Sequence, residues 1–182
     1  MTNLFFIALL TPEAVAQKII ALQKTVSEKY HSNHSLKSPP HVTLMPPFKY
    51  DGIFEKDINN PLMEFFLRSS PFTIQLEDFS CFEKNRVIFI NVIKTENVNR
   101  LFSGLTEFVK NNLPTVLPHQ HPTFTPHITI ASRDLRKEMF RNAWNEFKEK
   151  TFQETWAVKS AFLLQHTGKE WIPVLEFKFS EN

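Results

Sequence analysis

Hydrophobic residues along this chain follow two patterns: continuous apolar runs and apolar residues that recur at helical spacing. Continuous apolar runs at residues 3–10 and 87–92 predict strands that are buried on both faces. After the first run, Thr11 and Pro12 predict a helix start. Apolar residues then recur at spacings of four, three and four, which predicts a helix to about residue 30 with the stripe Val15, Ile19, Leu22 and Val26. The chain therefore opens with a strand and an amphipathic helix.

The remaining sequence continues with elements of the same two kinds. Further helices are predicted at residues 55–67, 98–109 and 135–147. Further strands are predicted at residues 41–44, 72–82, 86–93, 127–130, 152–164 and 171–179. Long loops at residues 31–40 and 113–126 precede two of the short strands.

Both halves of the chain show the same order of strand, helix, long loop, short strand and helix. The interval from Phe5 to His41 is 36 positions, and the interval from Ile88 to His127 is 39 positions. We interpret this order as duplication of one unit, with pseudo-repeats at about 1–85 and 86–182 that exchange a strand within a single bilobal domain covering residues 1–182. The expected fold class is α+β, with two antiparallel-rich sheets, helices on the outer faces and a central cleft.

Two short strands carry the same pattern of chemical groups. Pro-His-Val-Thr-Leu contains His41 and Thr43, and Pro-His-Ile-Thr-Ile contains His127 and Thr129. Because side chains alternate along a strand, each histidine shares a face with its threonine while the apolar residues take the other face. Duplication would place the two His/Thr pairs opposite each other.

This set of groups suits chemistry at phosphorus. Two imidazoles can divide the acid and base roles, one taking a proton from the nucleophile and one giving a proton to the leaving oxygen. Two hydroxyls can donate hydrogen bonds to the non-bridging phosphate oxygens. The arrangement needs no metal and suits a strained substrate such as a 2',3'-cyclic phosphate.

Other residues near the motifs are further candidates. Arg133 follows the second motif and could hold a phosphate in bidentate fashion. Phe48 and Phe124 flank the motifs and could stack on a base, although packing in the core or at its rim is the simpler reading in a chain with 19 phenylalanines. We expect Lys49 and Tyr50 to be surface residues.

The amino-acid composition excludes several kinds of binding site. The only glycines are Gly52, Gly104 and Gly168, so neither a G-x-G-x-x-G loop nor a phosphate-binding P-loop is present. The single cysteine, Cys81, excludes an intramolecular disulfide and a cysteine-rich zinc site. With 21 basic and 19 acidic residues the net charge is +2, too weak for a purely electrostatic nucleic-acid binder.

The sequence predicts a cytoplasmic protein without a membrane segment. No apolar stretch approaches the roughly 20 residues that span a bilayer. The first apolar run has no preceding positive residue and no small-residue cleavage site, unlike a signal peptide.

A metal site at the second long loop is an alternative reading. His119 and His121 form an H-x-H pair, and His31 or His34 could supply a third ligand. Solvated loop histidines are the simpler interpretation, so we expect neither metal nor cofactor. His166 is expected at the tip of the last hairpin, where it could overhang the cleft.

The two H-x-T-x motifs in a duplicated α+β chain resemble the 2H phosphoesterase superfamily, specifically its bacterial 2'-5' RNA ligase-like branch. Members of that superfamily are typically metal-free cyclic nucleotide or RNA phosphodiesterases, some with reversible 2'-5' ligation. The resemblance implies that His41 and His127 carry acid/base catalysis and that Thr43 and Thr129 hold the phosphate. We expect His41 to act as the acid on the 2'-oxygen and His127 as the base for water.

The sequence therefore predicts a metal-independent phosphoesterase for a 2',3'-cyclic phosphate or a 2'-5' phosphodiester. The expected partner is a small nucleotide or an RNA end, with no obligate protein partner and a monomeric state. Four alternatives stay open: an RNA- or nucleotide-binding module without turnover, a 2'-5' RNA ligase, a metal-dependent hydrolase, and a hydrolase of a related cyclic phosphate such as an ADP-ribose derivative.

Overall fold

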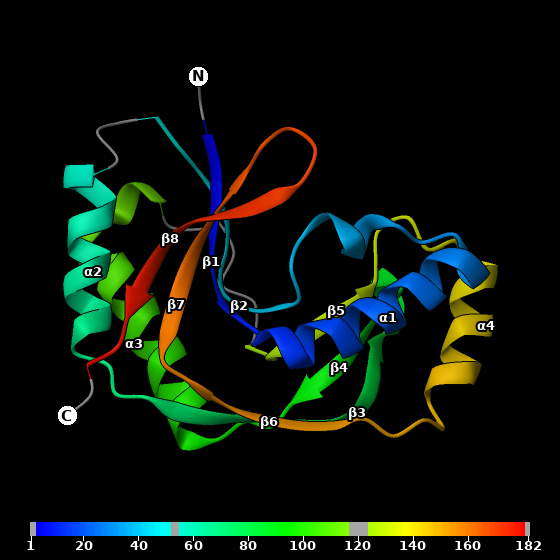
Figure 1. Ribbon diagram of the computed structural model, residues 1–182. Helices are drawn as coiled ribbons and strands as arrows, with labels where there is room; N and C mark the ends of the chain where they lie inside the picture. Colours follow the sequence, from blue (N-terminus) through cyan, green and yellow to red (C-terminus); the bar gives the residue numbers. More distant parts are fainter. Residues whose placement is uncertain (1–2, 52–54, 117–123, 181–182) are drawn as a thin grey trace.

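The computed structural model describes residues 3–51, 55–116 and 124–180, and these residues form two antiparallel four-stranded sheets (Figure 1). Sheet A contains, in spatial order, β2 (His41–Tyr50), β1 (Asn3–Leu10), β7 (Ser160–His166) and β8 (Trp171–Lys178). Sheet B contains β5 (His127–Ala131), β4 (Val87–Val92), β3 (Phe72–Phe82) and β6 (Gln153–Val158). Four α-helices accompany the sheets in the described part of the chain, which confirms the predicted α+β class.

Each sheet is packed against helices that come from both halves of the sequence. The helices α2 (Asn60–Leu67) and α3 (Glu96–Asn112) contact each other and sheet A, through β8 and β2 respectively. The helices α1 (Glu13–Tyr30) and α4 (Lys137–Phe147) contact each other and sheet B, through β5 and β4 respectively (Figure 1). Thus α1 directly follows a strand of sheet A but packs on sheet B, and α3 follows a strand of sheet B but packs on sheet A. The duplication of residues 1–85 and 86–182 stays an interpretation of the sequence.

A carboxylate fixes the contact between α1 and α4. Glu146 on α4 accepts hydrogen bonds from Tyr30 Oη at 2.5 Å and from Lys29 Nζ at 3.2 Å, both at the end of α1. Lys150 is a third partner and the second that is charged. The bond from Lys150, followed by that from Tyr30, lowers the pKa of Glu146 to about 2, whereas burial and the same carboxylate raise the pKa of Tyr30 to about 12. This cluster helps to hold the first helix of the chain on sheet B.

Three predicted elements differ from the structure. The predicted strand 41–44 continues to Tyr50 through Pro46 and Pro47, because β2 is an edge strand and both prolines lie at an irregularity in its register with β1, where neither has a partner residue. The single strand predicted at 152–164 is wrong: β6 pairs with β3 and β7 with β1, so the chain changes sheets at Lys159. The predicted helix at 55–67 begins with a π-helical segment at Glu55–Asn59, and Pro61 occupies the first turn of α2, where its missing N–H costs little.

The core runs on both sides of sheet A. Phe66 on α2 is fully buried and stacks on Phe177 of β8 with ring centroids 5.1 Å apart. On the opposite face, Phe6 and Ala8 of β1 form a smaller buried cluster with Leu164 of β7. Phe6 in this second cluster packs against His41 of β2, so the cluster supports the site described below. No helix in the described ranges is long and apolar enough to cross a bilayer.

Candidate active site

The two histidine strands lie at the edges of the two sheets and face each other. β2 is an edge strand of sheet A, β5 is an edge strand of sheet B, and the two strands are in contact. Each begins in the same way: the carbonyl of Pro40 accepts a hydrogen bond from the Thr11 N–H at 3.3 Å, and that of Pro126 accepts one from the Val92 N–H at 3.3 Å. The site is therefore formed where the edges of two sheets meet.

Alternation along these strands separates polar from apolar side chains. Along β2, His41 and Thr43 are half-buried, while Val42 and Leu44 are in the core. Along β5, His127 and Thr129 are half-buried while the residues between and after them, Ile128 and Ile130, are fully buried. The buried branched residues anchor each strand, and the imidazole and hydroxyl groups stay on the accessible face.

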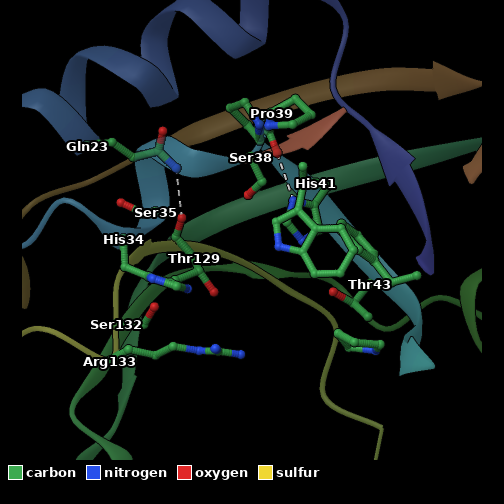
Figure 2. Close-up of a pocket in the computed structure, with 14 residues that line it drawn as sticks. Gln23, His34, Ser35, Ser38, Pro39, His41, Thr43, Thr129, Ser132 and Arg133 are labelled. Atoms are coloured by element: carbon green, nitrogen blue, oxygen red, sulfur yellow. Dashed lines mark hydrogen bonds between the residues drawn. The ribbon is translucent and has the colours of Figure 1, made fainter. Parts of the chain in front are cut away.

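A pocket of about 200 Å³ lies between the sheets (Figure 2). Four of the sequence-predicted site residues line it: His41, Thr43, Thr129 and Arg133. His127 is not among the lining residues, yet its charge is near enough to lower the pKa of His41. The remaining lining residues are Phe6, Gln23, His34, Ser35, Ser38, Pro39, Pro40, Pro47, Ser132 and Trp171.

Both histidines are held by the same hydrogen bond. Nδ1 of His41 lies 2.7 Å from the carbonyl oxygen of Pro39, and Nδ1 of His127 lies 2.6 Å from that of Thr125. A carbonyl oxygen can only accept, so Nδ1 must carry the hydrogen in each ring. The lone pair of each neutral imidazole is therefore on Nε2, the nitrogen left for proton transfer.

Burial disfavours the charged form of both imidazoles. It lowers the pKa of His41 to about 4, against the opposing effect of the Pro39 carbonyl, and the charge of His127 lowers that pKa further. Burial also lowers the pKa of His127. Because a proton on one ring disfavours a proton on the other, the pair tends to carry at most one, as a division between acid and base requires.

Each histidine also packs against a phenylalanine of the neighbouring strand. The ring centroids of His41 and Phe6 are 4.8 Å apart, and those of His127 and Phe89 are also 4.8 Å apart. Phe82 adds an edge contact to His127 at 5.2 Å. These rings limit rotation of the imidazoles and supply the apolar surroundings that lower their pKa values.

The two threonine hydroxyls have no hydrogen-bond partner among the residues that the structure describes, so both are available to a ligand. Arg133 is exposed, adopts a left-handed backbone conformation with φ 54°, and brings a cation to the pocket wall. Burial and then the charge of Arg133 lower the pKa of His34, which lines the same wall. Two hydroxyls and a guanidinium are groups that bind a phosphate.

Residues from the first half of the chain hold β5 in place. Gln23 on α1, only 2% exposed, donates from Nε2 to the Thr129 carbonyl at 3.0 Å, and Ser35 donates to the Ile130 carbonyl at 2.8 Å. Asp134 accepts from the hydroxyl of Ser32 at 2.7 Å, and its other oxygen accepts from two backbone N–H groups of the following turn. These bonds satisfy carbonyls on the open edge of sheet B and fix the second histidine strand.

The structure does not place either predicted stacking phenylalanine at the pocket. Phe48 is 5% exposed and packs on Phe5 in the core, so its predicted stacking role is wrong. Two register irregularities between β1 and β2 separate Phe48 from the His41 motif, so alternation from His41 does not give the face of the strand on which Phe48 lies. Phe124 stacks on Phe102 of α3, with centroids 3.7 Å apart, and does not line the pocket.

The sequence also offered Lys49, Tyr50, His119 and His121 as candidates. Lys49 is exposed and Tyr50 is half-buried, and both lie at the end of β2 outside this pocket. His119 and His121 fall outside the described residues. Among residues 3–51, 55–116 and 124–180, no group of three or more His, Cys, Asp or Glu side chains is arranged to hold a metal ion.

Sequence reasoning missed Trp171 and Gln23. Trp171 begins β8, lines the pocket and packs edge-on against Phe6 at 4.6 Å and against His166 at 4.8 Å. Nothing in the local sequence indicates this position, because it depends on β8 lying beside β7. Gln23 had a signal: it falls four residues after Ile19, on the apolar face of α1, where a buried polar residue needs a partner.

Known proteins resemble this chain both in sequence and in fold. A curated protein of Bacillus pumilus (strain SAFR-032) named "Putative phosphoesterase" is 27% identical over 119 residues, which are 65% of this chain and 66% of that protein, just under two thirds. A crystal structure of a Thermus thermophilus protein has a TM-score of 0.71 at 22% identity and covers 99% of both chains. Escherichia coli LigT complexed with 3'-AMP has a TM-score of 0.69 at 17% identity and covers both chains fully.

The solved structures support the fold, and a family model shows to which family the chain belongs. The model described as the 2'-5' RNA ligase superfamily matches residues 11–170, which include both histidine motifs and Arg133. This chain therefore belongs to the 2'-5' RNA ligase superfamily of 2H phosphoesterases.

Proposed function

We propose that this protein is a metal-independent phosphoesterase that hydrolyses a 2',3'-cyclic phosphate at an RNA end or on a nucleotide, with the 2'-5' phosphodiester as a second possible substrate bond. The observation that carries the proposal is the matched pair of histidines. Both donate from Nδ1 to the carbonyl two residues earlier, both contact a phenylalanine at 4.8 Å, and both therefore keep Nε2 for proton transfer.

In the proposed reaction, the phosphate lies between the two sheets and accepts hydrogen bonds from the hydroxyls of Thr43 and Thr129. Arg133 balances its charge from the pocket wall. These donors bind the non-bridging oxygens, whose charge increases as the nucleophile approaches. Neither hydroxyl has to break a bond with a described protein group to do so.

Proton transfer is assigned to the imidazoles. His127 Nε2 takes a proton from water as the water oxygen bonds to phosphorus. The bond between phosphorus and the 2'-oxygen breaks, and His41 Nε2 gives that oxygen a proton. The product is a 3'-phosphate with a free 2'-hydroxyl, and the compound present in the LigT complex, 3'-AMP, is of this kind.

The lowered pKa of His41 constrains this assignment. With a pKa of about 4, His41 carries little proton at neutral pH before substrate binds. An anionic phosphate beside the ring stabilises its protonated form and raises its pKa. His41 can therefore act as an acid only with substrate in place, which couples its protonation to binding.

The proposal is tested by hydrolysis of the four nucleoside 2',3'-cyclic monophosphates in the presence of EDTA. We expect chelator-resistant turnover that His41→Ala and His127→Ala each abolish, with chromatography showing a 3'-phosphate product. His31→Asn is the matched control, because His31 is exposed, outside the pocket and in a left-handed conformation (φ 58°) that asparagine tolerates.

The other outcomes separate the alternatives. Binding of nucleotide without turnover by the wild type would favour a binding module. Turnover that EDTA abolishes would favour a metal-dependent hydrolase. Turnover that survives both histidine substitutions would show that the site assignment is wrong, and a 2'-phosphate product would reverse the choice of leaving oxygen.

A further inference from the structure

A second groove is lined by residues of the turn that joins β3 to β4 and by residues of the helix α4. The helix α4 packs against β4 (Figure 1). The volume of the groove is about 530 Å³. Lys84 and Arg86 line one side, and Lys137, Arg141 and Trp144 line the other. None of these residues lines the pocket between the sheets, so this groove is a separate surface.

The groove concentrates positive charge. It is lined by four cations and one carboxylate, Glu83, in a protein whose net charge is only +2. The side chains of Lys84, Lys137 and Arg141 make no hydrogen bond or ion pair with any residue that the structure describes. These three charges are therefore available to an external anion.

The position of Arg86 is fixed by the backbone. Arg86 adopts a left-handed conformation with φ 54°, and its Nε donates to the carbonyl of Leu135 at 3.1 Å. This bond uses one of the five donors of the guanidinium and leaves the others for a ligand. A cation held in a defined orientation loses less entropy when it binds a phosphate than a free lysine does.

The helical side combines charge with an aromatic ring. Lys137, Arg141 and Trp144 are spaced at i, i+4 and i+7, so they lie along one face of α4. Trp144 is half-buried, and part of its ring is accessible in the groove. A basic surface with an aromatic ring is the combination that binds single-stranded nucleic acid, with the cations on phosphates and the ring against a base.

A short segment joins this groove to the catalytic pocket. Arg133 lines the pocket and Lys137 lines the groove, so their Cα atoms are at most about 14 Å apart. Between them, the carboxylate of Asp134 is occupied by the bonds to Ser32 and the following turn. The two sites are therefore joined by a short segment, and the acidic residue within that segment, Asp134, is already paired.

We propose that this groove binds the single-stranded part of an RNA whose 3' end occupies the catalytic pocket. The inference rests on the proposed function for the identity of that end, and it adds that the preferred substrate is an oligonucleotide rather than a mononucleotide. Phosphates two or three nucleotides from the end bind Lys84, Arg86, Lys137 and Arg141. A base packs against Trp144.

Binding is measured by fluorescence anisotropy with a 5'-labelled single-stranded oligoribonucleotide that ends in a 3'-hydroxyl, which the enzyme cannot turn over. We expect Lys137→Ala combined with Arg141→Ala to raise Kd roughly tenfold at about 0.1 M salt, since two phosphate contacts are lost. The salt dependence of log Kd should become shallower by about 1.4, or about 0.7 for each cation removed. Both residues are exposed, so we expect the fold to be unaffected.

The matched control removes two exposed lysines that do not line the groove, Lys94→Ala with Lys110→Ala, for the same change in net charge. We expect this variant to bind the oligonucleotide within twofold of the wild type. In hydrolysis assays, the groove variant should raise KM for an oligonucleotide with a 2',3'-cyclic end and leave kcat/KM for a cyclic mononucleotide unchanged.

Several results would overturn the inference. Equal losses in the two double variants would indicate a general charge effect, and no loss in the groove variant would exclude the groove. Displacement of the RNA by poly-glutamate at a similar concentration of charge would indicate an acidic protein as the partner. Since anisotropy needs no turnover, a failure of the proposed hydrolysis would leave this test of the groove intact.

Discussion

The hydroxyls of Thr43 and Thr129 provide a direct test of phosphate binding. Replacement by valine keeps the shape and the strand preference of the side chain and removes only the hydroxyl. Neither hydroxyl has a hydrogen-bond partner in the described residues, so the free energy of unfolding should change by no more than about 0.5 kcal/mol. The loss should therefore appear in catalysis.

The expected size follows from the charge of the ligand. A hydrogen bond to a charged group contributes about 1.5–3 kcal/mol. If the bond is made to an oxygen that gains charge in the transition state, each valine variant should lower kcat/KM by about 10- to 150-fold. The double variant should lose about the product of the two factors if the hydroxyls act independently.

The assay is kcat/KM for a nucleoside 2',3'-cyclic monophosphate, with thermal unfolding recorded for each variant. Thr43→Ser and Thr129→Ser keep the hydroxyl and should stay within a few-fold of the wild type. Thr73→Val on β3 makes the same chemical change at an exposed strand position outside the pocket and should have no effect. A stable valine variant with wild-type kcat/KM would refute the role of that hydroxyl.

Three further predictions concern proton binding and stability. Because burial lowers the pKa values of both His41 and His127 in the free protein, kcat/KM should be highest below about pH 6.5 and should fall as pH rises and the acid loses its proton. The value of kcat, which reports the enzyme with substrate bound, should persist to higher pH. An optimum of kcat/KM above pH 7 would contradict this prediction. Glu146→Gln removes a carboxylate whose pKa is lowered to about 2, so it should cost about 1 kcal/mol in urea unfolding at pH 7, after allowance for solvent screening. That cost should fall to about half at pH 3, because the stabilisation is present above the unfolded pKa and is lost as pH falls towards the folded one. Phe66→Ala should lower the free energy of unfolding by about 3–5 kcal/mol, against less than about 1 kcal/mol for its exposed neighbour Leu67→Ala; equal effects would show that the stack with β8 adds little.

Local patterns predicted most of the elements, because periodicity depends only on which face of an element is buried. The apolar run at residues 3–10 and the stripe from Val15 to Val26 correspond to β1 and α1. Sheet membership depends on distant partners and is not written in a local pattern. Residues 152–164 therefore looked like one strand, whereas Lys159 separates two strands of different sheets.

The same distinction applies to the candidate site. His41 and Thr43 could be identified because strand alternation and the repeated motif are both local features. Trp171 could not, because it reaches the pocket only through the pairing of β8 with β7. Phe48 failed because closeness in sequence to a motif does not fix the face of the strand on which a side chain lies.

The strand order of sheet A has a consequence for synthesis of the protein on the ribosome. β1 is central in the sheet, with five consecutive buried residues from Phe5 to Leu9, and one of its two neighbours, β7, is translated more than 150 residues later. At about 5–20 residues per second, this apolar strand waits roughly 10–30 s with one edge unpaired. β2 can pair with one edge of β1 early in synthesis, but the other edge stays open until β7 is made, and the pocket between the sheets is not complete until almost the whole sequence has been made.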